Sequence, residues 1–199
     1  MSASAEDQLR DAAARNDVDT IRRLLNAGAS IDARDQRGRT ALLIATHADK
    51  VEAASVLVEA GADVNAKDDI QDSAYLYAGA RGHLDILKLT LAHGADLKST
   101  NRYGGTALIP AAERGHVETV RTLIAAGVDI DHVNNLGWTA LLEAVILGDG
   151  GRRHVDIVRL LVDAGADVTI PDREGVTSLE HARARGFGEI AAILENAGR

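Results

Sequence analysis

The chain has 199 residues, of which 46% are hydrophobic but only 3% aromatic, so any core must be built mainly from Ala, Leu, Val and Ile. The net charge of −8 argues against nucleic acid as a partner, because phosphate binding needs a concentrated basic surface. The absence of cysteine excludes disulfides and thiolate metal sites. No apolar run has the length of a signal peptide or of a membrane span, so we expect a cytoplasmic protein, although a removed leader would leave no trace.

The first segment, residues 5–34, predicts two helices, over Asp7–Arg15 and Val18–Ala27. It lacks the turn motif that recurs later, and its first helix is rich in polar residues. We therefore expect it to cap one end of a repeat array.

A glycine closes an apolar run at a nearly constant spacing along the chain. The interval is 33 residues in every case but one, where it is 38. Such a fixed period predicts a repeat architecture. The glycines are Gly28, Gly61, Gly94, Gly127, Gly165 and Gly198.

A second motif opens each later unit, as in "DQRGRTALLIA" from Asp35. Asp or Asn starts a tight turn, Gly supplies an unusual backbone angle, and Thr caps a short helix. The weakest copy, "DIQDSAYLYA" from Asp69, lacks the glycine and has Ser73 in place of Thr. Other copies start at Asn101, Asn134 and Asp172.

A second helix follows each short helix after a Gly-His break, as at Gly115-His116. In "VETVRTLIAAG" the apolar residues Val120, Leu123 and Ile124 recur at helical spacing, and Gly127 ends the run. Each unit is therefore expected to be a turn followed by two helices.

These motifs resemble the ankyrin repeat over almost the whole chain. The resemblance implies one all-α domain over residues 1–199, a solenoid of stacked helix-turn-helix units with short β-turn or hairpin tips. The family's Pro after the capping Thr is mostly Ala here, as at Ala41, and its His is replaced by apolar residues or Glu. The expected units span about 5–34, 35–67, 68–100, 101–133, 134–171 and 172–199, the first and last being caps.

The resemblance also implies a function. Members of the family typically bind other proteins through a concave groove and the turn tips, so we expect a bacterial-type ankyrin protein, a monomer, that binds another protein. We expect it to bind neither nucleic acid nor membrane. The alternatives are a regulatory or accessory subunit that binds a peptide or small ligand, for example in a stress-defence system, and an array that self-associates through its tips.

The tips of the fourth and fifth units carry apolar residues where polar ones are usual. Tyr103, beside Arg102, is followed one unit later by Leu136 and Trp138. Exposed aromatic residues next to Arg are typical anchors of protein interfaces. The alternative is that Trp138 folds down over its own turn.

A set of positions on the first helices predicts a mixed-charge patch near these tips. Its members on the expected groove are Tyr77, Arg81, Glu113, Arg114 and Glu143. The alternative is a solvated face with weak intramolecular ion pairs. Apolar Ile146 either contacts a partner or packs under a neighbouring insertion, and for Leu147 we expect the second. Pro110, in the same set, is expected to be tolerated in the first turn after the capping Thr106.

Catalytic and metal-binding arrangements are not expected. His83, His116 and His154 recur once per unit, roughly 10 Å apart if helix pairs stack normally, which is too far to share an ion. Glu113 and Glu143 are the nearest thing to a carboxylate pair, but nothing else of an active site accompanies them. We expect no enzyme, no catalytic residues, no cofactor and no metal.

The longer interval comes from five extra residues, Asp149–Arg153, in "ILGDGGRRHVDIV". The repeat register places them between the two helices of the fifth unit, where a loop insertion costs little. They form either a neutral extension, whose deletion leaves folding unharmed, or a basic protrusion through Arg152 and Arg153.

Overall fold

The computed structural model describes residues 3–198, which form twelve α-helices and no β-strand. They divide into two compact units, one of residues 3–78 and 83–96 and the other of residues 79–82 and 97–198. The expected all-α repeat architecture is confirmed. Within these residues, no helix combines the length and the apolar character that a bilayer-spanning segment needs.

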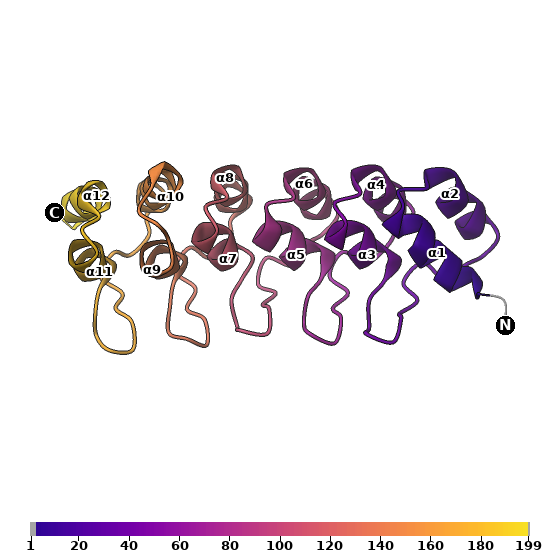
Figure 1. The fold of residues 1–199 in the computed structure, drawn as a ribbon, viewed down its shortest axis with the longest axis horizontal. Helices are drawn as coiled ribbons and strands as arrows, with labels where there is room; N and C mark the ends of the chain where they lie inside the picture. The colour runs from indigo at the N-terminus through magenta and orange to yellow at the C-terminus, as the bar shows by residue number, and fades with distance from the viewer. Residues whose placement is uncertain (1–2, 199) are drawn as a thin grey trace. The chain divides into compact units, whose positions relative to one another are not determined.

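The first unit contains α1 (Ala5–Ala14), α2 (Val18–Asn26), α3 (Ala41–His47), α4 (Val51–Glu59) and α6 (Leu84–Ala92). The helix α5 (Ala74–Arg81) begins in this unit and ends in the other. In the first two helix pairs the first helix packs on the second, α1 on α2 and α3 on α4. First helices also pack on first helices, α1 on α3, and second helices on second helices, α2 on α4 and α4 on α6. Both rows can be followed in Figure 1.

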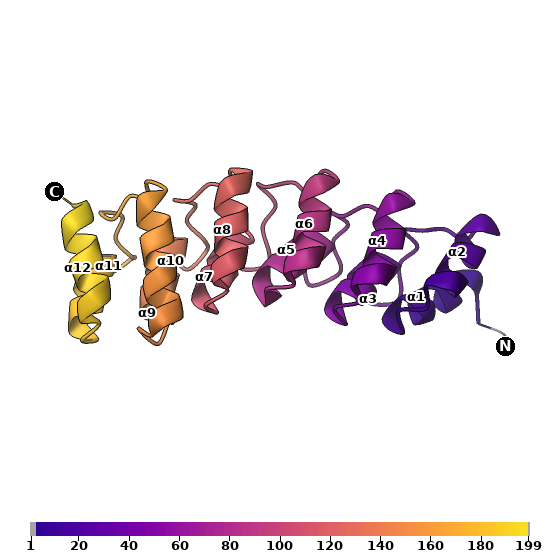
Figure 2. The same ribbon diagram turned by 90° about the horizontal axis from the view of Figure 1, so that it is seen from above.

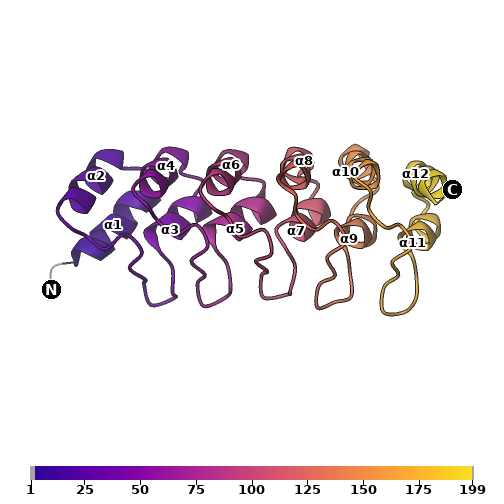
Figure 3. The same cartoon turned by 180° about the vertical axis from the view of Figure 1, so that it is seen from behind.

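The second unit contains α7 (Leu108–Glu113), α8 (Val117–Ala126), α9 (Ala140–Ile146), α10 (Arg152–Asp163), α11 (Ser178–Ala184) and α12 (Gly188–Ala197). Here α7, α9 and α11 form one row and α8, α10 and α12 the other, with contacts along and between the rows. Figure 2 shows α8, α10 and α12 aligned with one another. Figure 3 shows the loops before α9 and α11 projecting on the side of the first helices.

Small and branched aliphatic side chains fill the space between the rows, as the composition predicts. In the second unit Ala144 and Ala112 are fully buried and let the short helices approach closely. Burying each larger aliphatic side chain stabilises the fold by about 1.5–3 kcal/mol relative to exposure. The large buried residues of this unit include Leu108, Leu123, Leu142, Ile157 and Leu161.

Threonine caps begin three of the six first helices, α3, α9 and α11, as predicted. Thr40 and Thr139 each accept a hydrogen bond on Oγ1 from the backbone N–H three residues later, at 3.2 Å in both cases. The fourth repeat differs. There α7 begins only at Leu108, and the buried hydroxyl of Thr106 has no hydrogen-bond partner.

The expected cap at Thr106 is therefore wrong, and Pro110 supplies the physical reason. In the third and fifth repeats, the residue four positions after the capping residue donates its backbone N–H to the carbonyl of that residue, as Tyr77 does to Ser73 and Glu143 to Thr139. Proline has no N–H to donate, so the helix loses its first hydrogen bond and starts later.

Candidate functional site

The turn tips are fixed by one side chain each. In the fourth repeat, Oδ1 of Asn101 accepts hydrogen bonds from the backbone N–H groups of Tyr103 and Gly105, at 2.9 and 3.1 Å. The same two bonds recur in every copy of the motif, two and four residues after the Asp or Asn that opens the turn. In the third copy that residue is Asp68, so the start expected at Asp69 is wrong by one residue. A side chain that bonds its own turn in this way holds the tip in one conformation. The residues that do so are Asp35, Asp68, Asn101, Asn134 and Asp172.

Neighbouring tips of the second unit are also bonded to one another. The backbone N–H of Asn135 donates to the carbonyl of Tyr103 at 2.9 Å, and Arg173 donates to the carbonyl of Asn135. His132 reaches back through Nε2 to the carbonyl of Gly104 at 2.7 Å. These bonds place Tyr103 and Leu136 on adjacent, mutually anchored loops.

The tips carry exposed apolar side chains, as the sequence predicts. Tyr103 is 54% exposed and Leu136 is 47% exposed, whereas Trp138 is half-buried. The guanidinium carbon of Arg102 lies 4.9 Å from the centre of the Tyr103 ring, a cation–π contact. We call Arg102, Tyr103, Leu136 and Trp138 the tip surface.

Glu143 does not lie on the surface where the mixed-charge patch was expected. It is 5% exposed, and its Oε1 accepts a hydrogen bond from Nδ2 of Asn134 at 2.8 Å. Burial, and secondarily the charge of Glu113, raise the pKa of Glu143 to about 7. This carboxyl group therefore ties α9 to its own tip, and it is only partly ionised near neutral pH.

The other predicted site residues of the second unit lie at the ends of first helices. Glu113 is half-buried at the end of α7, and its carbonyl accepts a hydrogen bond from His154 Nε2 at 2.8 Å. Arg114 is exposed and donates to the carbonyl of Ala80 at 2.7 Å. Arg81 is exposed and Ile146 half-buried.

The structure changes the expectations for Leu147 and Tyr77. Leu147 is 50% exposed, so it does not pack under the insertion as expected, because it caps α9 with its side chain facing solvent. Tyr77 belongs to the first unit, where its ring lies 4.1 Å from that of His47 and 6.0 Å from that of His83.

The recurring histidines sit at helix starts, but not by capping with their side chains. His83 and His116 occupy the N-cap positions of α6 and α8 and make no side-chain cap bond. His154 lies inside the first turn of α10 and is almost fully buried. Among residues 3–198 there is no group of three or more His, Cys, Asp or Glu side chains placed to hold a metal ion.

The insertion is partly helical rather than wholly a loop. Gly151 is the N-cap of α10, so Arg152 and Arg153 form its first turn and lengthen it to 12 residues. Asp149 Oδ1 accepts from the N–H of Gly151 at 2.9 Å and lies 2.8 Å from Nδ1 of His154. The extra residues thus make an ordered cap for α10.

Sequence reasoning missed a second feature, an arginine-lined hollow in the first unit. Its lining includes Arg10 of α1 and three arginines from the first tip. The signal in the sequence is "RDQRGR", residues 34–39, a basic cluster in an acidic chain. Arg10 joins the cluster only through folding, because it lies 24 positions before Arg34 in the sequence.

Comparison with known proteins identifies the fold's relatives. The family of ankyrin repeats (3 copies) matches residues 9–68 and 74–172. No match was found among curated protein sequences. An ankyrin repeat domain from Acinetobacter baumannii AYE is 64% identical, with 96% of this chain and 97% of that one covered and a TM-score of 0.94.

Two further solved structures extend the likeness. The ankyrin repeat protein EF0377 is 43% identical over 98% of both chains, with a TM-score of 0.92. The ankyrin repeat domain of Bcl-3, of the IkappaB protein family, is 28% identical over 96% of this chain and 86% of that one, with a TM-score of 0.86. Ankyrin repeats are in general protein–protein interaction modules. With its turn motif, paired helices and these matches, the chain belongs to the ankyrin-repeat family.

Proposed function

We propose that the second unit binds a partner protein through the tip surface and the adjoining ends of its first helices. The observation that carries this proposal is that Tyr103 and Leu136, two large apolar side chains, are about half exposed on adjacent loops. Exposed apolar groups beside arginine are common at the centre of protein interfaces, where Tyr, Trp and Arg supply most of the binding energy.

The rigidity of the tips supports the proposal. Each tip is bonded to its own Asx side chain and to the next tip, so binding would order little additional chain. A surface that is already ordered loses less conformational entropy on binding, so more of the contact energy contributes to affinity.

The first-helix ends would contribute a polar rim. Arg114 and Arg81 are exposed and Glu113 is half-buried, whereas Ile146 adds apolar area beside them. Glu143 has a different role, because its buried carboxyl contacts Asn134 and would act by holding the tip.

Affinity capture from cells of the source organism, followed by mass spectrometry, tests the proposal. The bait proteins are the wild type, the double variant Tyr103→Ser/Leu136→Ser, and the control Ile70→Ser. Ile70 is 50% exposed and holds the same turn position as the two tip residues, but it belongs to the first unit, outside the proposed surface. We expect the double variant to lose a partner that the wild type and the control both retain.

Recovery of the same proteins at equal yield by the double variant would refute the proposal. If a small ligand is bound instead, the captured proteins will not differ. In that case metabolite mixtures will raise the melting temperature of the wild type, since a ligand specific for the folded state stabilises it.

A further inference from the structure

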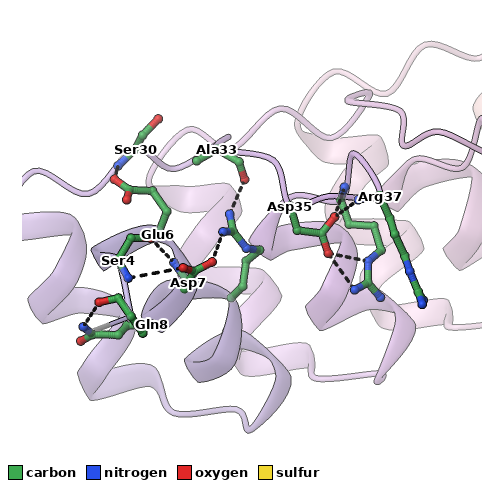
Figure 4. A network of polar contacts seen from close by, with 11 residues as sticks. Ser4, Glu6, Asp7, Gln8, Ser30, Ala33, Asp35 and Arg37 are labelled. Carbon is green, nitrogen blue, oxygen red and sulfur yellow. Dashed lines mark hydrogen bonds and ion pairs between the residues drawn. The ribbon is translucent and has the colours of Figure 1, made fainter. Parts of the chain in front are cut away.

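The first unit contains an open hollow of about 520 Å³ between α1 and the first turn tip. Four of its lining residues are arginines and two are aspartates, and Figure 4 shows the polar contacts among them. The arginines are Arg10, Arg34, Arg37 and Arg39, and the aspartates are Asp7 and Asp35.

Both aspartates are already paired. Asp7 Oδ1 lies 2.6 Å from the guanidinium of Arg10, and Asp35 Oδ2 lies 2.7 Å from that of Arg39. Each pair is formed within one element, by residues three or four positions apart. These pairs leave no carboxylate in the lining for the remaining two arginines.

Arg34 and Arg37 therefore carry charges that the hollow does not neutralise. Arg34 donates to the main-chain carbonyls of Gly38 and Lys67, which have no formal charge. The guanidinium of Arg37 is exposed and makes no hydrogen bond or ion pair with the part of the chain that the structure describes. Asp69, on the next tip, lies against Gly38 but forms no ion pair with Arg37.

The excess of two positive charges is local, because the chain as a whole carries −8. A guanidinium presents several donors in a plane and binds a carboxylate through two parallel hydrogen bonds. The volume falls within the range of ligand pockets, and it suits a few residues of an extended peptide rather than a duplex. The overall acidity of the chain disfavours nucleic acid as the occupant.

We propose that this hollow binds an acidic peptide segment of a partner protein, with two neighbouring Asp or Glu carboxylates paired to Arg34 and Arg37. The site is separate from the tip surface of the second unit, and it rests on different residues. Its test is therefore independent of the proposed function above.

The experiment uses the full chain and a fluorescein-labelled peptide with four consecutive glutamates flanked by Gly and Ser. A matched peptide carries four glutamines instead. Fluorescence anisotropy at low and at moderate salt measures the dissociation constants. We expect the Glu peptide to bind, the Gln peptide not to bind, and added salt to weaken binding because the attraction is between charges.

Arg37→Ala is the decisive variant, because its side chain supports nothing in the fold and its loss should leave the melting temperature unchanged. Arg22→Ala is the matched control, since Arg22 is exposed on α2 and lies outside the hollow. We expect Arg37→Ala to weaken binding roughly tenfold, as loss of a charged hydrogen-bonded partner typically does, and Arg22→Ala to leave it unchanged.

Three results would overturn the proposal. The first is equal binding of the Glu and Gln peptides, and the second is an equal effect of the two arginine substitutions. The third is displacement of the Glu peptide by inorganic phosphate or a single-stranded oligonucleotide at lower concentrations than unlabelled Glu peptide. That outcome would make the hollow a phosphate site instead.

Discussion

Nδ2 of Asn134 donates a hydrogen bond to Oε1 of Glu143 across 2.8 Å, and this bond joins the start of a turn motif to a helix residue nine positions later. The same two positions are bonded in the last unit, where Nε2 of His181 lies 2.6 Å from Oδ2 of Asp172. In both repeats a pair of polar side chains joins the first helix to the turn tip of the same repeat. In the fifth repeat the pair contains the buried carboxyl of Glu143, and this burial has a measurable consequence.

The buried carboxyl of Glu143 should make stability depend on pH. Its pKa is raised from 4.5 to about 7 by burial and by Glu113, so between these values the folded state holds a proton that the unfolded chain has lost. The free energy of unfolding should therefore fall as pH rises from about 4.5 to about 7 and level off above it. Glu143→Gln should remove this dependence and stabilise the protein at pH 8 by about 1–3 kcal/mol.

Urea unfolding at pH 4.5 and pH 8 checks this expectation. The two proteins should have similar midpoints at pH 4.5, where Glu143 is protonated in the folded state and still about half protonated in the unfolded chain, and should separate at pH 8. A wild type that gains stability over the same range relative to Glu143→Gln would show that Glu143 is ionised when folded.

Much of the fold follows from local rules that the sequence displays. Gly closing each second helix, Asx opening each turn and the 33-residue period predict the units and their helices. The position of Glu143 did not follow, since a Glu on a first helix was expected to face solvent. Its burial depends on Asn134, nine residues away, and on packing within the unit, which no periodicity reveals.

The hollow beside α1 escaped prediction for a related reason. Arg37 and Arg39 are visible as tip residues, but the sequence does not show that Asp35 pairs with Arg39 and leaves Arg37 without a partner. The start of α7 was missed although Pro110 was noticed. Because Pro110 has no backbone N–H, the helix starts later, and the hydroxyl of Thr106 is left without the hydrogen bond that a capping threonine makes.

The two threonines Thr106 and Thr139 should respond oppositely to the same substitution. Thr139→Val removes a helix cap and should destabilise the protein by about 1 kcal/mol. Thr106→Val removes a buried hydroxyl that has no partner, so it should be neutral or stabilise by up to about 1 kcal/mol. Thermal and urea unfolding of both variants measure the difference, and equal losses would mean that Thr106 does cap its helix.

The tip of the third repeat, which has Gln71 where the other tips have glycine, should have a strained backbone. Gln71 has a φ of 67°, the left-handed conformation that glycine adopts in the other tips, and such a conformation costs about 1 kcal/mol for an ordinary residue. Gln71→Gly should therefore stabilise the protein by about 1 kcal/mol or less, since glycine also gains freedom in the unfolded chain.

The reverse substitution provides the control. Gly175 has a φ of 80°, and open space surrounds the position of a Cβ atom there, so Gly175→Gln adds the same backbone strain without a clash. It should lower the urea midpoint by about as much as Gln71→Gly raises it. Shifts of the same sign in both variants would contradict the strain argument.

Arg185 should hold the last unit against the insertion. Its guanidinium donates to the carbonyl of Ile146, the last residue of α9, and to that of Gly148, just after the helix, and its carbon lies 4.7 Å from the centre of the Phe187 ring. That ring occupies the space that a side chain at Gly150 would need. Deleting Asp149–Arg153 would remove part of this contact, so we now expect the deletion to loosen the last unit rather than to be neutral.

The substitution Arg185→Ala isolates this effect, and Arg183→Ala is its control. Arg183 pairs with half-buried Glu195 at 2.7 Å, a surface ion pair worth about 0–1 kcal/mol. Arg185→Ala should cost about 1–2 kcal/mol, because it leaves helix-end carbonyls without a donor. Since each repeat contacts only its neighbours, the loss should appear as faster hydrogen exchange in α11 and α12 while α7 and α8 keep their protection. Equal exchange in the two variants would show that Arg185 contributes no more than a surface ion pair.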